Sequence, residues 1–322
     1  MAKFYIRKVL QYLLVILFII TLNFLLPRMM PGDPLKFILG EDVVLMTSEQ
    51  IEAARERHGL DRSLISQYSD YITKLLGGDL GSSLARGRRP VADIISERLP
   101  WTLLLQSLNV VISTFIGIFF GTIAAWNRGK KIDIILNNIF IFFRSMPSFW
   151  IGMILVAVFA AGFGWFPIFG AKTNYPPLYG MDRFIDITRH AVLPLTTLVI
   201  LSVSSTYLIM RYSMIDVLGE DFILMVKMKG LPDKKVRMTH GMRNALVPVA
   251  TVVLMNIGYM VGGSVIIETV FAYPGMGRLM YEAITNRDYP TLQACLLIMT
   301  LCVIAANIIA DILYPLIDPR VV

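Results

Sequence analysis

The chain has 322 residues, of which 56% are hydrophobic and 16% charged, and its formal net charge is +7. Soluble domains are about 45–50% apolar and about 25% charged, so this composition argues against an ordinary soluble globular fold. The 30 basic residues are scattered between apolar runs instead of gathering on one polar domain, which argues against a nucleic-acid-binding protein.

Six apolar runs are long enough to cross a hydrocarbon core about 30 Å thick, which takes about 20 mainly apolar residues in a helix. The third run contains Pro147, which lacks a backbone N–H and therefore predicts a kink or break. The pattern predicts an all-α polytopic membrane protein with six transmembrane helices. We place the runs at 9–30, 100–126, 134–164, 190–216, 246–270 and 291–315.

The first run is predicted to be a retained membrane anchor, so that 1–30 holds a cytoplasmic amino terminus and the first span. The stretch Val9–Leu26 is longer than the apolar core of a signal peptide, which has about 7–15 residues. It also lacks a small-x-small cleavage site.

The segment 31–99 is predicted to be a small helical region outside the membrane. Thr47 and Gln50 have the spacing of a capping box before a helix at 51–58, which Gly59 would end. Apolar side chains at helical spacing predict a second helix at about 62–76. This face is predicted to pack on membrane helices, with an external partner as the alternative; its members are Leu64, Tyr68, Tyr71, Ile72 and Leu75.

The remaining residues, 100–322, are predicted to form a five-helix core with alternating basic loops. Basic residues exceed acidic ones at the amino terminus and in the segments 127–133 and 217–245. Since short loops rich in Lys and Arg stay in the cytoplasm, both termini are predicted to be cytoplasmic. The segments 31–99, 165–189 and 271–290 then lie outside, and the net positive charge is a topology signal.

Ionisable side chains are scarce inside the apolar runs, which disfavours an ion-coupled carrier or channel. All except Arg144 lie near the ends of their runs, where we expect them to reach the membrane interface. The six are Arg28, Arg144, Arg211, Asp216, Glu268 and Asp311.

Motifs for catalysis are missing from the sequence. The phosphate-loop pattern G-x-x-x-x-G-K-[ST] does not occur, and neither do H-E-x-x-H and G-x-S-x-G. We therefore predict no catalytic, cofactor-binding or metal-ligating residue and no ATP hydrolysis by this chain alone. An enzyme is disfavoured, and a membrane scaffold would not need the loop described next.

The segment 217–245 is predicted to hold a short amphipathic helix at 220–230. Phe222, Met225 and Val226, with Met228 as a further candidate, mark one apolar face before a glycine stop at Gly230. A second, basic helix at 234–244 leads into the fifth run. Such helices suit insertion into a groove on a partner protein, and a position on anionic lipid is the equal alternative.

The loop resembles the cytoplasmic coupling loop of ABC importer permeases, specifically the dipeptide, oligopeptide and nickel branch. The resemblance rests on Asp221-Phe222, Lys229-Gly230-Leu231 and 243–248 (RNALVP). It continues in order along nearly the whole chain, through 26–34 (LPRMMPGDP), 59–61 (GLD), 78–81 (GDLG), 97–100 (ERLP), 147–150 (PSFW), 271–277 (FAYPGMG), 287–290 (RDYP) and 318–320 (DPR). The chain departs from the general motif at 224–226, where Leu-Met-Val replaces Glu-Ala-Ala.

The resemblance implies a type I permease of a bacterial or archaeal plasma membrane, which forms half of a pathway with a second, homologous permease subunit. Two cytoplasmic subunits would bind ATP and Mg, and an extracytoplasmic protein would deliver the substrate. Short peptides are the implied cargo, with nickel complexes, glutathione or oligosaccharides as alternatives. The residues implied to couple the chain to the ATPase are Asp221, Phe222, Met225, Val226, Lys229, Gly230, Leu231, Asn244 and Pro248.

Polar residues inside the runs are candidates for lining the pathway. They are Arg144, Ser145 and Ser148 around Pro147, and Asn256 in the fifth run, with interhelical hydrogen bonding as the equal alternative. The pairs Gly117/Gly121 and Gly258/Gly262 permit close helix approach, for which static packing is the preferred interpretation.

Overall fold

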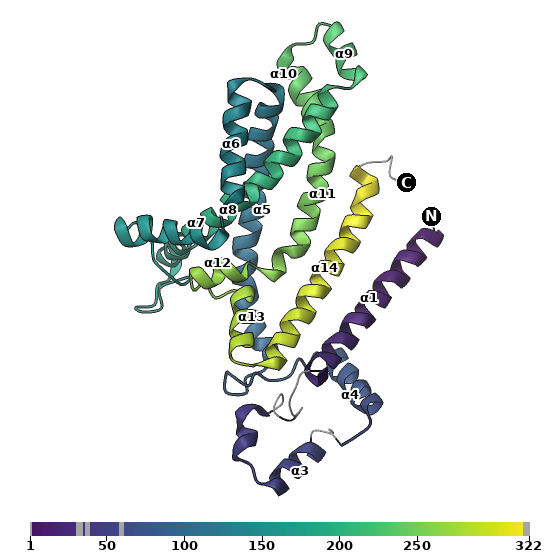
Figure 1. Ribbon diagram of the computed structural model, residues 1–322, viewed down its shortest axis with the longest axis vertical. Coiled ribbons are helices and arrows are strands. Elements are labelled where there is room, and N and C mark those ends of the chain that lie inside the picture. Colours follow the sequence, from purple (N-terminus) through teal and green to yellow (C-terminus); the bar gives the residue numbers. More distant parts are fainter. Residues whose placement is uncertain (1, 30–34, 36–38, 58–60, 318–322) are drawn as a thin grey trace. The chain divides into compact units, whose positions relative to one another are not determined.

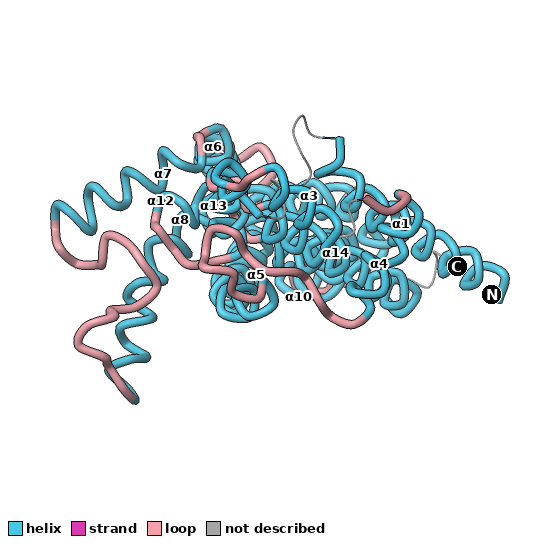
Figure 2. Tube along the Cα trace, turned by 90° about the horizontal axis from the view of Figure 1, so that it is seen from below, coloured by secondary structure: helices cyan, strands magenta, loops and turns pink. Residues whose placement is uncertain are grey.

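The computed structural model describes residues 2–29, 35, 39–57 and 61–317, and within these ranges the regular secondary structure is helical, with one isolated bridge between Ser82 and Pro90. Figure 2 shows the helices joined by loops, the longest of which precedes α8 (Gly180–Leu218). The chain forms two compact units, which we describe separately. The first comprises 1–100 and 275–304, and the second 101–274 and 305–322.

The all-helical polytopic fold class predicted from the sequence is confirmed. Four helical stretches are long and apolar enough to cross a membrane: Val91–Trp126, Gly180–Leu218, Asp233–Gly262 and Tyr289–Ile309. A bent pair, Lys131–Ser145 with Ser148–Gly162, would supply a fifth span. The first predicted run corresponds to α1 (Ala2–Met29), which contains the shorter apolar stretch Leu10–Leu25.

The predicted break at Pro147 is confirmed, and it is sharp. Helix α6 (Lys131–Ser145) is separated from α7 (Ser148–Leu155) and the π-helix η2 (Val156–Gly162) by a bend of 98°. Pro147 adopts an extended conformation and cannot donate a backbone hydrogen bond. The run 134–164 is therefore not one straight helix.

The fifth predicted run, 246–270, is wrong as a single span. A helical stretch made of α10 (Asp233–Lys235), η3 (Val236–Met242), α11 (Arg243–Tyr259) and η4 (Met260–Gly262) ends at Gly263. Gly263 has φ +63°, a left-handed conformation that glycine adopts without penalty. The short helix α12 (Val265–Val270) then begins anew, capped by the side chain of Ser264.

In the first unit, η1 (Gly40–Leu45) is followed by α3 (Ser48–Arg57), whose predicted capping box is confirmed. The backbone N–H of Thr47 donates to Gln50 Oε1 at 2.9 Å, and the N–H of Gln50 donates to Thr47 Oγ1 at 3.4 Å. These bonds satisfy two donors that the first turn of a helix leaves free. The predicted stop at Gly59 lies outside the described residues.

The structure places α4 (Leu64–Leu76) against α1, the helix of the first predicted run. The Phe24 ring of α1 lies 5.0 Å from the Tyr68 ring and 5.7 Å from the Tyr71 ring, measured between centroids. The hydroxyls of Thr21 and Tyr68 are hydrogen-bonded at 2.7 Å. Leu64, predicted on the same face, is exposed instead.

The rest of the first unit joins the start of α5 (Val91–Trp126) to α13 (Met276–Thr285) and α14 (Tyr289–Ile317). Its core consists of Val91, Ile94, Ile95, Met276, Leu279, Ala294 and Cys295. Residues from the segments 31–99 and 271–290, predicted to share one side of the membrane, are thus in contact. Segments on one side of a membrane can make such a contact, and the orientation stays a prediction.

The second unit is organised around the long helix α8, which packs on α6, α7, α11 and α12. A Cβ atom at Gly117 would lie 2.6 Å from Thr206 Cβ, and one at Gly121 would lie 2.8 Å from Met210 Cβ. Two carbon atoms cannot approach so closely, so both glycines let α5 contact α8 at backbone distance. The predicted close approach at this pair is confirmed.

Candidate functional site

The loop between α8 and α11 forms a helical hairpin at one end of the second unit, where α9 and α10 lie beyond the ends of α8 and α11 (Figure 1). Helix α9 (Asp221–Met228) follows Glu220, as the sequence predicts. Gly230 has φ +73°, so the chain reverses there in a conformation that a side chain would strain. The predicted turn is confirmed.

The predicted apolar face of α9 is wrong in detail, because the helix has two apolar faces. Ile223, which the sequence pattern did not single out, is fully buried, with Phe222 and Val226 half-buried beside it. Met225 and Met228, predicted on the Phe222 face, point outward with Leu224. With apolar residues all around the helix, the spacing alone could not decide which face the protein itself covers.

The outward face of α9 is an exposed apolar patch. Its side chains, Leu224, Met225 and Met228, are 58%, 55% and 71% exposed. They lie at positions i, i+1 and i+4, which share one side of a helix. Met side chains are flexible and suit grooves of irregular shape. An exposed patch of this kind is typical of a surface that contacts another protein or a membrane.

The opposite side of the hairpin is attached to the end of α5 through Trp126. Lys227 Nζ of α9 lies 5.8 Å from the centre of the Trp126 ring, and Arg237 Cζ of η3 lies 5.9 Å from it. Each is a cation–π contact worth about 0.5–1 kcal/mol at an exposed site. Sequence reasoning missed this link, since no local pattern pairs Trp126 with residues a hundred positions later.

The hairpin is also anchored to α8 by close packing. A Cβ atom at Gly241 of η3 would meet Met214 Cε at 3.2 Å and Leu218 Cδ2 at 3.4 Å. Ser213 Oγ donates to the carbonyl oxygen of Ala245 at 3.0 Å. Because η3 and the start of α11 contact the end of α8 directly, a displacement of the hairpin would reach both long helices.

Arg211 of α8 is not an interfacial residue near a helix end, as the sequence led us to expect, but half of a buried ion pair. Its Nε and Nη2 donate to Asp133 Oδ1 and Oδ2 at 2.7 and 2.8 Å. Asp133 also accepts from the N–H of Gly129 at 3.0 Å. The pair fastens the start of α6 to α8. Its sequence signal was weak, because Asp133 stood in a basic loop.

Glu268 departs from the same expectation. This residue of α12 is 2% exposed, and its Oε1 accepts from Thr102 Oγ1 at 3.1 Å and from the N–H of Ser264 at 3.3 Å. Burial, and to a lesser degree the negative charge of Glu268, raises the pKa of Tyr273. Through its hydrogen bonds to Thr102 and Ser264, the Glu268 carboxylate connects the segment that follows Gly263 to α5.

The other predicted coupling residues lie in the hairpin or at the start of α11. Asp221 begins α9 and Lys229 follows its end, both exposed, whereas Leu231 is half-buried. Asn244 Nδ2 donates to the carbonyl oxygen of His240 at 2.7 Å. Pro248 lies inside α11. Their contacts with another subunit stay a prediction.

Three of the four pathway candidates lie together at the bend between α6 and α7. Arg144 and Ser145 are exposed and Ser148 is half-buried, and Ser145 Oγ donates to the carbonyl oxygen of Ile141 at 2.9 Å. Asn256 is exposed on α11, a different helix. Pathway lining stays a prediction for all four. Within the described part of the chain, His, Cys, Asp and Glu side chains form no group of three or more that could hold a metal.

Comparisons with known families match nearly the whole chain. Residues 117–322 match the family of binding-protein-dependent transport system inner membrane components, and residues 1–106 match the amino-terminal region of such membrane components. The oligopeptide transport system permease protein AppB of Bacillus subtilis is 34% identical over 100% of this chain and 99% of its own length. The glutathione transport system permease protein GsiC of Escherichia coli strain K12 is 35% identical over the same shares.

Among solved structures, the chain resembles the methionine ABC transporter MetNI in its inward-facing conformation. The TM-score is 0.56, with 13% sequence identity, and the match covers 70% of this chain and 96% of that one. An amino acid ABC transporter solved with histidines matches with a TM-score of 0.52 and 14% identity over 69% of this chain and 94% of that chain. These similarities concern the fold.

Proposed function

The chain belongs to the family of inner membrane components of binding-protein-dependent transport systems, and we propose that this ABC importer permease carries short peptides. Relatives that match along their whole length are named for oligopeptides and for glutathione, which is itself a tripeptide. Nickel complexes and oligosaccharides remain the alternatives drawn from the sequence.

The cargo proposal is supported by the relatives, and the observation that supports coupling to ATPase subunits is the way α9 is attached to its own unit. One face of the helix is an exposed apolar patch, and the other is fixed to its own unit by Ile223 and by the contacts of Trp126. Because the covered face of α9 is attached to α5, a force applied to its exposed face would also act on α5. We infer that the patch enters a groove on a cytoplasmic ATPase subunit.

We further propose how the force would spread. Closure of two ATPase subunits on ATP would displace the hairpin, and Trp126 would carry that displacement to α5. The packing of Gly241 would carry it to α8, and the Arg211–Asp133 pair from α8 to α6. Helices linked in this way move together as rigid bodies between two arrangements. The pathway would therefore switch between inward-open and outward-open states.

The proposal includes a partner set and an orientation. A second, homologous permease subunit completes the pathway, two cytoplasmic subunits bind ATP and Mg, and an extracytoplasmic protein delivers the peptide. Lipid surrounds the spans, and both termini lie in the cytoplasm. The basic residues of 127–133 and 217–245 support this orientation.

The test is uptake by the whole complex in proteoliposomes. Labelled di-, tri- and pentapeptides should be transported only when ATP is present on the cytoplasmic face of the complex and the binding protein is present on the opposite face. Unlabelled glutathione, a nickel chelate and an oligosaccharide serve as competitors, and competition by one of the last two would replace the peptide assignment. Uptake by the isolated chain without ATP would instead indicate an ion-coupled carrier or channel.

A further inference from the structure

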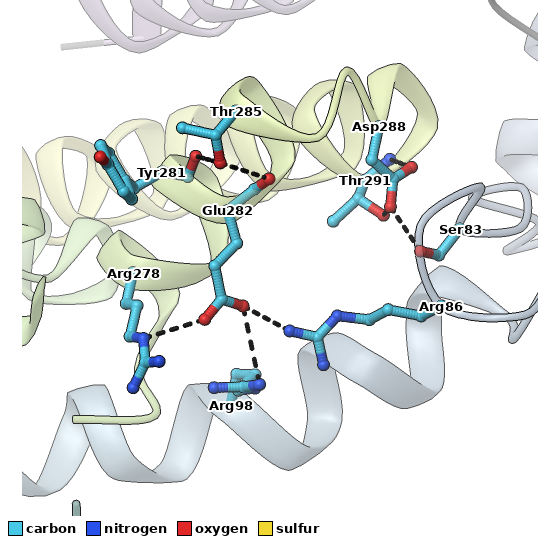
Figure 3. A network of polar contacts seen from close by, with 9 residues as sticks. All are labelled: Ser83, Arg86, Arg98, Arg278, Tyr281, Glu282, Thr285, Asp288 and Thr291. Carbon is cyan, nitrogen blue, oxygen red and sulfur yellow. Dashed lines mark hydrogen bonds and ion pairs between the residues drawn. The ribbon is translucent and has the colours of Figure 1, made fainter. Parts of the chain in front are cut away.

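Three guanidinium groups of the first unit converge on one carboxylate (Figure 3). Arg278 Nε lies 2.9 Å from Glu282 Oε1, and Arg86 donates a hydrogen bond to Oε2 of the same side chain. Arg98 Nη2 is 3.8 Å from Oε2, an ion-pair distance beyond hydrogen-bond range. The arginines come from three places in the chain: a loop, the start of α5 and the first turn of α13.

The loop that carries Arg86 is held in place by a buried aspartate. Asp288 accepts hydrogen bonds from Ser83 Oγ, from the N–H of Leu84 at 3.2 Å and from Thr291 Oγ1 at 2.8 Å (Figure 3). This fastens the loop to the start of α14. The position of Arg86 is thus determined by the fold and not by the flexibility of an exposed loop.

The charges in this cluster do not balance. Glu282 is the carboxylate that contacts all three guanidinium groups. Glu97 lies close enough to Arg86 and Arg98 to interact with both, but its hydrogen bond is to Arg89 at 2.6 Å, and Asp288 bonds the loop. The side chains of Arg86, Arg98 and Arg278 are only 28%, 16% and 31% exposed, so water screens this excess charge less than it would at a fully exposed site.

The cluster continues into an exposed face of α13. The spacing of Tyr281 and Thr285 places them on the same side of this helix as Arg278 and Glu282, and both are exposed. Ile284, next to them, is exposed as well. Arg and Tyr are the side chains that protein interfaces use most as anchors, because each combines a large contact area with polar groups.

We propose that this arginine surface, made of Arg86, Arg98, Arg278, Tyr281 and Glu282, receives carboxylate side chains of the extracytoplasmic substrate-binding protein. The inference rests on the proposed function and its topology, which place 31–99 and 271–290 outside. A guanidinium group binds a carboxylate through two parallel hydrogen bonds, and Glu282 already orients the guanidinium groups. A surface for anionic lipid would instead present mobile, fully exposed cations, which the burial of these arginines contradicts.

The experiment uses the complete complex in nanodiscs and measures ATP hydrolysis while its binding protein is titrated. Arg86→Gln and Arg278→Gln should each raise the binding-protein concentration for half-maximal stimulation about tenfold, the effect of losing one charge pair. Raising the salt concentration should weaken stimulation more in the wild type than in these variants. The matched control is Arg62→Gln, which removes an exposed arginine paired with Asp70 in the same unit and should change nothing.

Size-exclusion chromatography checks that each variant assembles. Should a glutamine variant fail to assemble, Tyr281→Ser removes an exposed side chain from the same surface and should raise the half-maximal concentration in the same direction. An unchanged half-maximal concentration in assembled variants would overturn the assignment. So would an effect that occurs with anionic lipid and vanishes in neutral nanodiscs, which would identify a lipid headgroup as the ligand. A wild-type complex that no binding protein stimulates would contradict the proposed function itself.

Discussion

Arg211 and Asp133 are 78 positions apart in the chain, yet they form a two-pronged ion pair that joins α8 to α6. Their side chains are 14% and 5% exposed. Removing one partner of a buried pair leaves the other charged and unpaired, which costs more than losing both. The pair therefore attaches the bent segment that begins with α6 to α8, the helix that leads into the hairpin containing α9.

Asp133→Asn should lower the free energy of unfolding by about 3–5 kcal/mol, because Arg211 would keep its charge without a carboxylate. The double variant Asp133→Leu with Arg211→Met should recover most of that loss. Denaturant unfolding of the purified protein in detergent measures both. As a control, Arg62→Gln breaks an exposed pair and should cost less than about 1 kcal/mol. Equal losses for the single and double variants would contradict this account.

Gly117→Ala should destabilise the second unit by about 1–3 kcal/mol, the usual effect of adding a carbon to a filled contact. The new Cβ would lie 2.6 Å from Thr206 Cβ, so α5 and α8 would have to separate. Thermal unfolding in detergent provides the measurement. Val111→Ala, at an exposed position of the same helix, is the control and should have little effect. A stable Gly117→Ala variant would show that the helices have room to move apart.

Gly230→Val should leave membrane insertion intact but uncouple uptake from ATP hydrolysis. The positive φ of Gly230 strains a β-branched residue, so the hairpin and α9 would be displaced. Gly230→Asn is the matched control, since asparagine tolerates this conformation and should retain transport. The ratio of peptide imported to ATP hydrolysed, measured in proteoliposomes, decides between them. Normal coupling in Gly230→Val would exclude a role for the turn. Gly230→Pro should uncouple as well.

Single cysteines on the outward face of α9 should crosslink to an ATPase subunit. Met225→Cys and Met228→Cys expose their thiols, whereas Ile223→Cys on the covered face should not react. Cys295 and Cys302 would first be replaced by alanine. Analysis of the products by mass spectrometry identifies the partner. Crosslinks to lipid alone would favour the interpretation of α9 as an interfacial helix, which the sequence left equally open.

Arg144→Ala and Asn256→Ala should each reduce peptide uptake without disturbing assembly, if these exposed polar groups line the pathway. Arg144 lies beside the bend at Pro147, where a carboxylate of the substrate would be attracted to it. The measurement is the initial rate of uptake at a fixed ATP concentration. Normal rates in an intact complex would leave interhelical hydrogen bonding as their role.

Much of the fold followed from local patterns. The capping box at Thr47 and Gln50, the break at Pro147 and the turn at Gly230 are consequences of backbone chemistry within a few residues, and each prediction is confirmed. The fifth run was misjudged because continuous hydrophobicity hides a change of direction. Gly263 ends the helix there, although its neighbours are as apolar as a span requires.

The candidate site likewise has some features that local sequence predicts and others that depend on distant contacts. Its location between α8 and α11, its acidic start and its glycine turn were readable from the sequence, because they depend on short-range spacing. The choice of outward face on α9 was not, since Ile223 is buried only by residues distant in the chain. The contacts of Trp126 and the Arg211–Asp133 pair were hidden for the same reason.

The sequence by itself therefore determined that this is a helical membrane protein of six apolar runs, with alternating basic loops and one helical hairpin between the fourth and fifth runs. Apolarity, charge and backbone chemistry depend only on the residues within each segment, so they can be recognised without knowing which segments are in contact. Only the tertiary structure decided which charges are buried as pairs, which face of α9 stays exposed and where three arginines meet Glu282. Those features arise only when distant segments pack against one another. Packing buries some side chains beside a partner from another segment and leaves other side chains exposed.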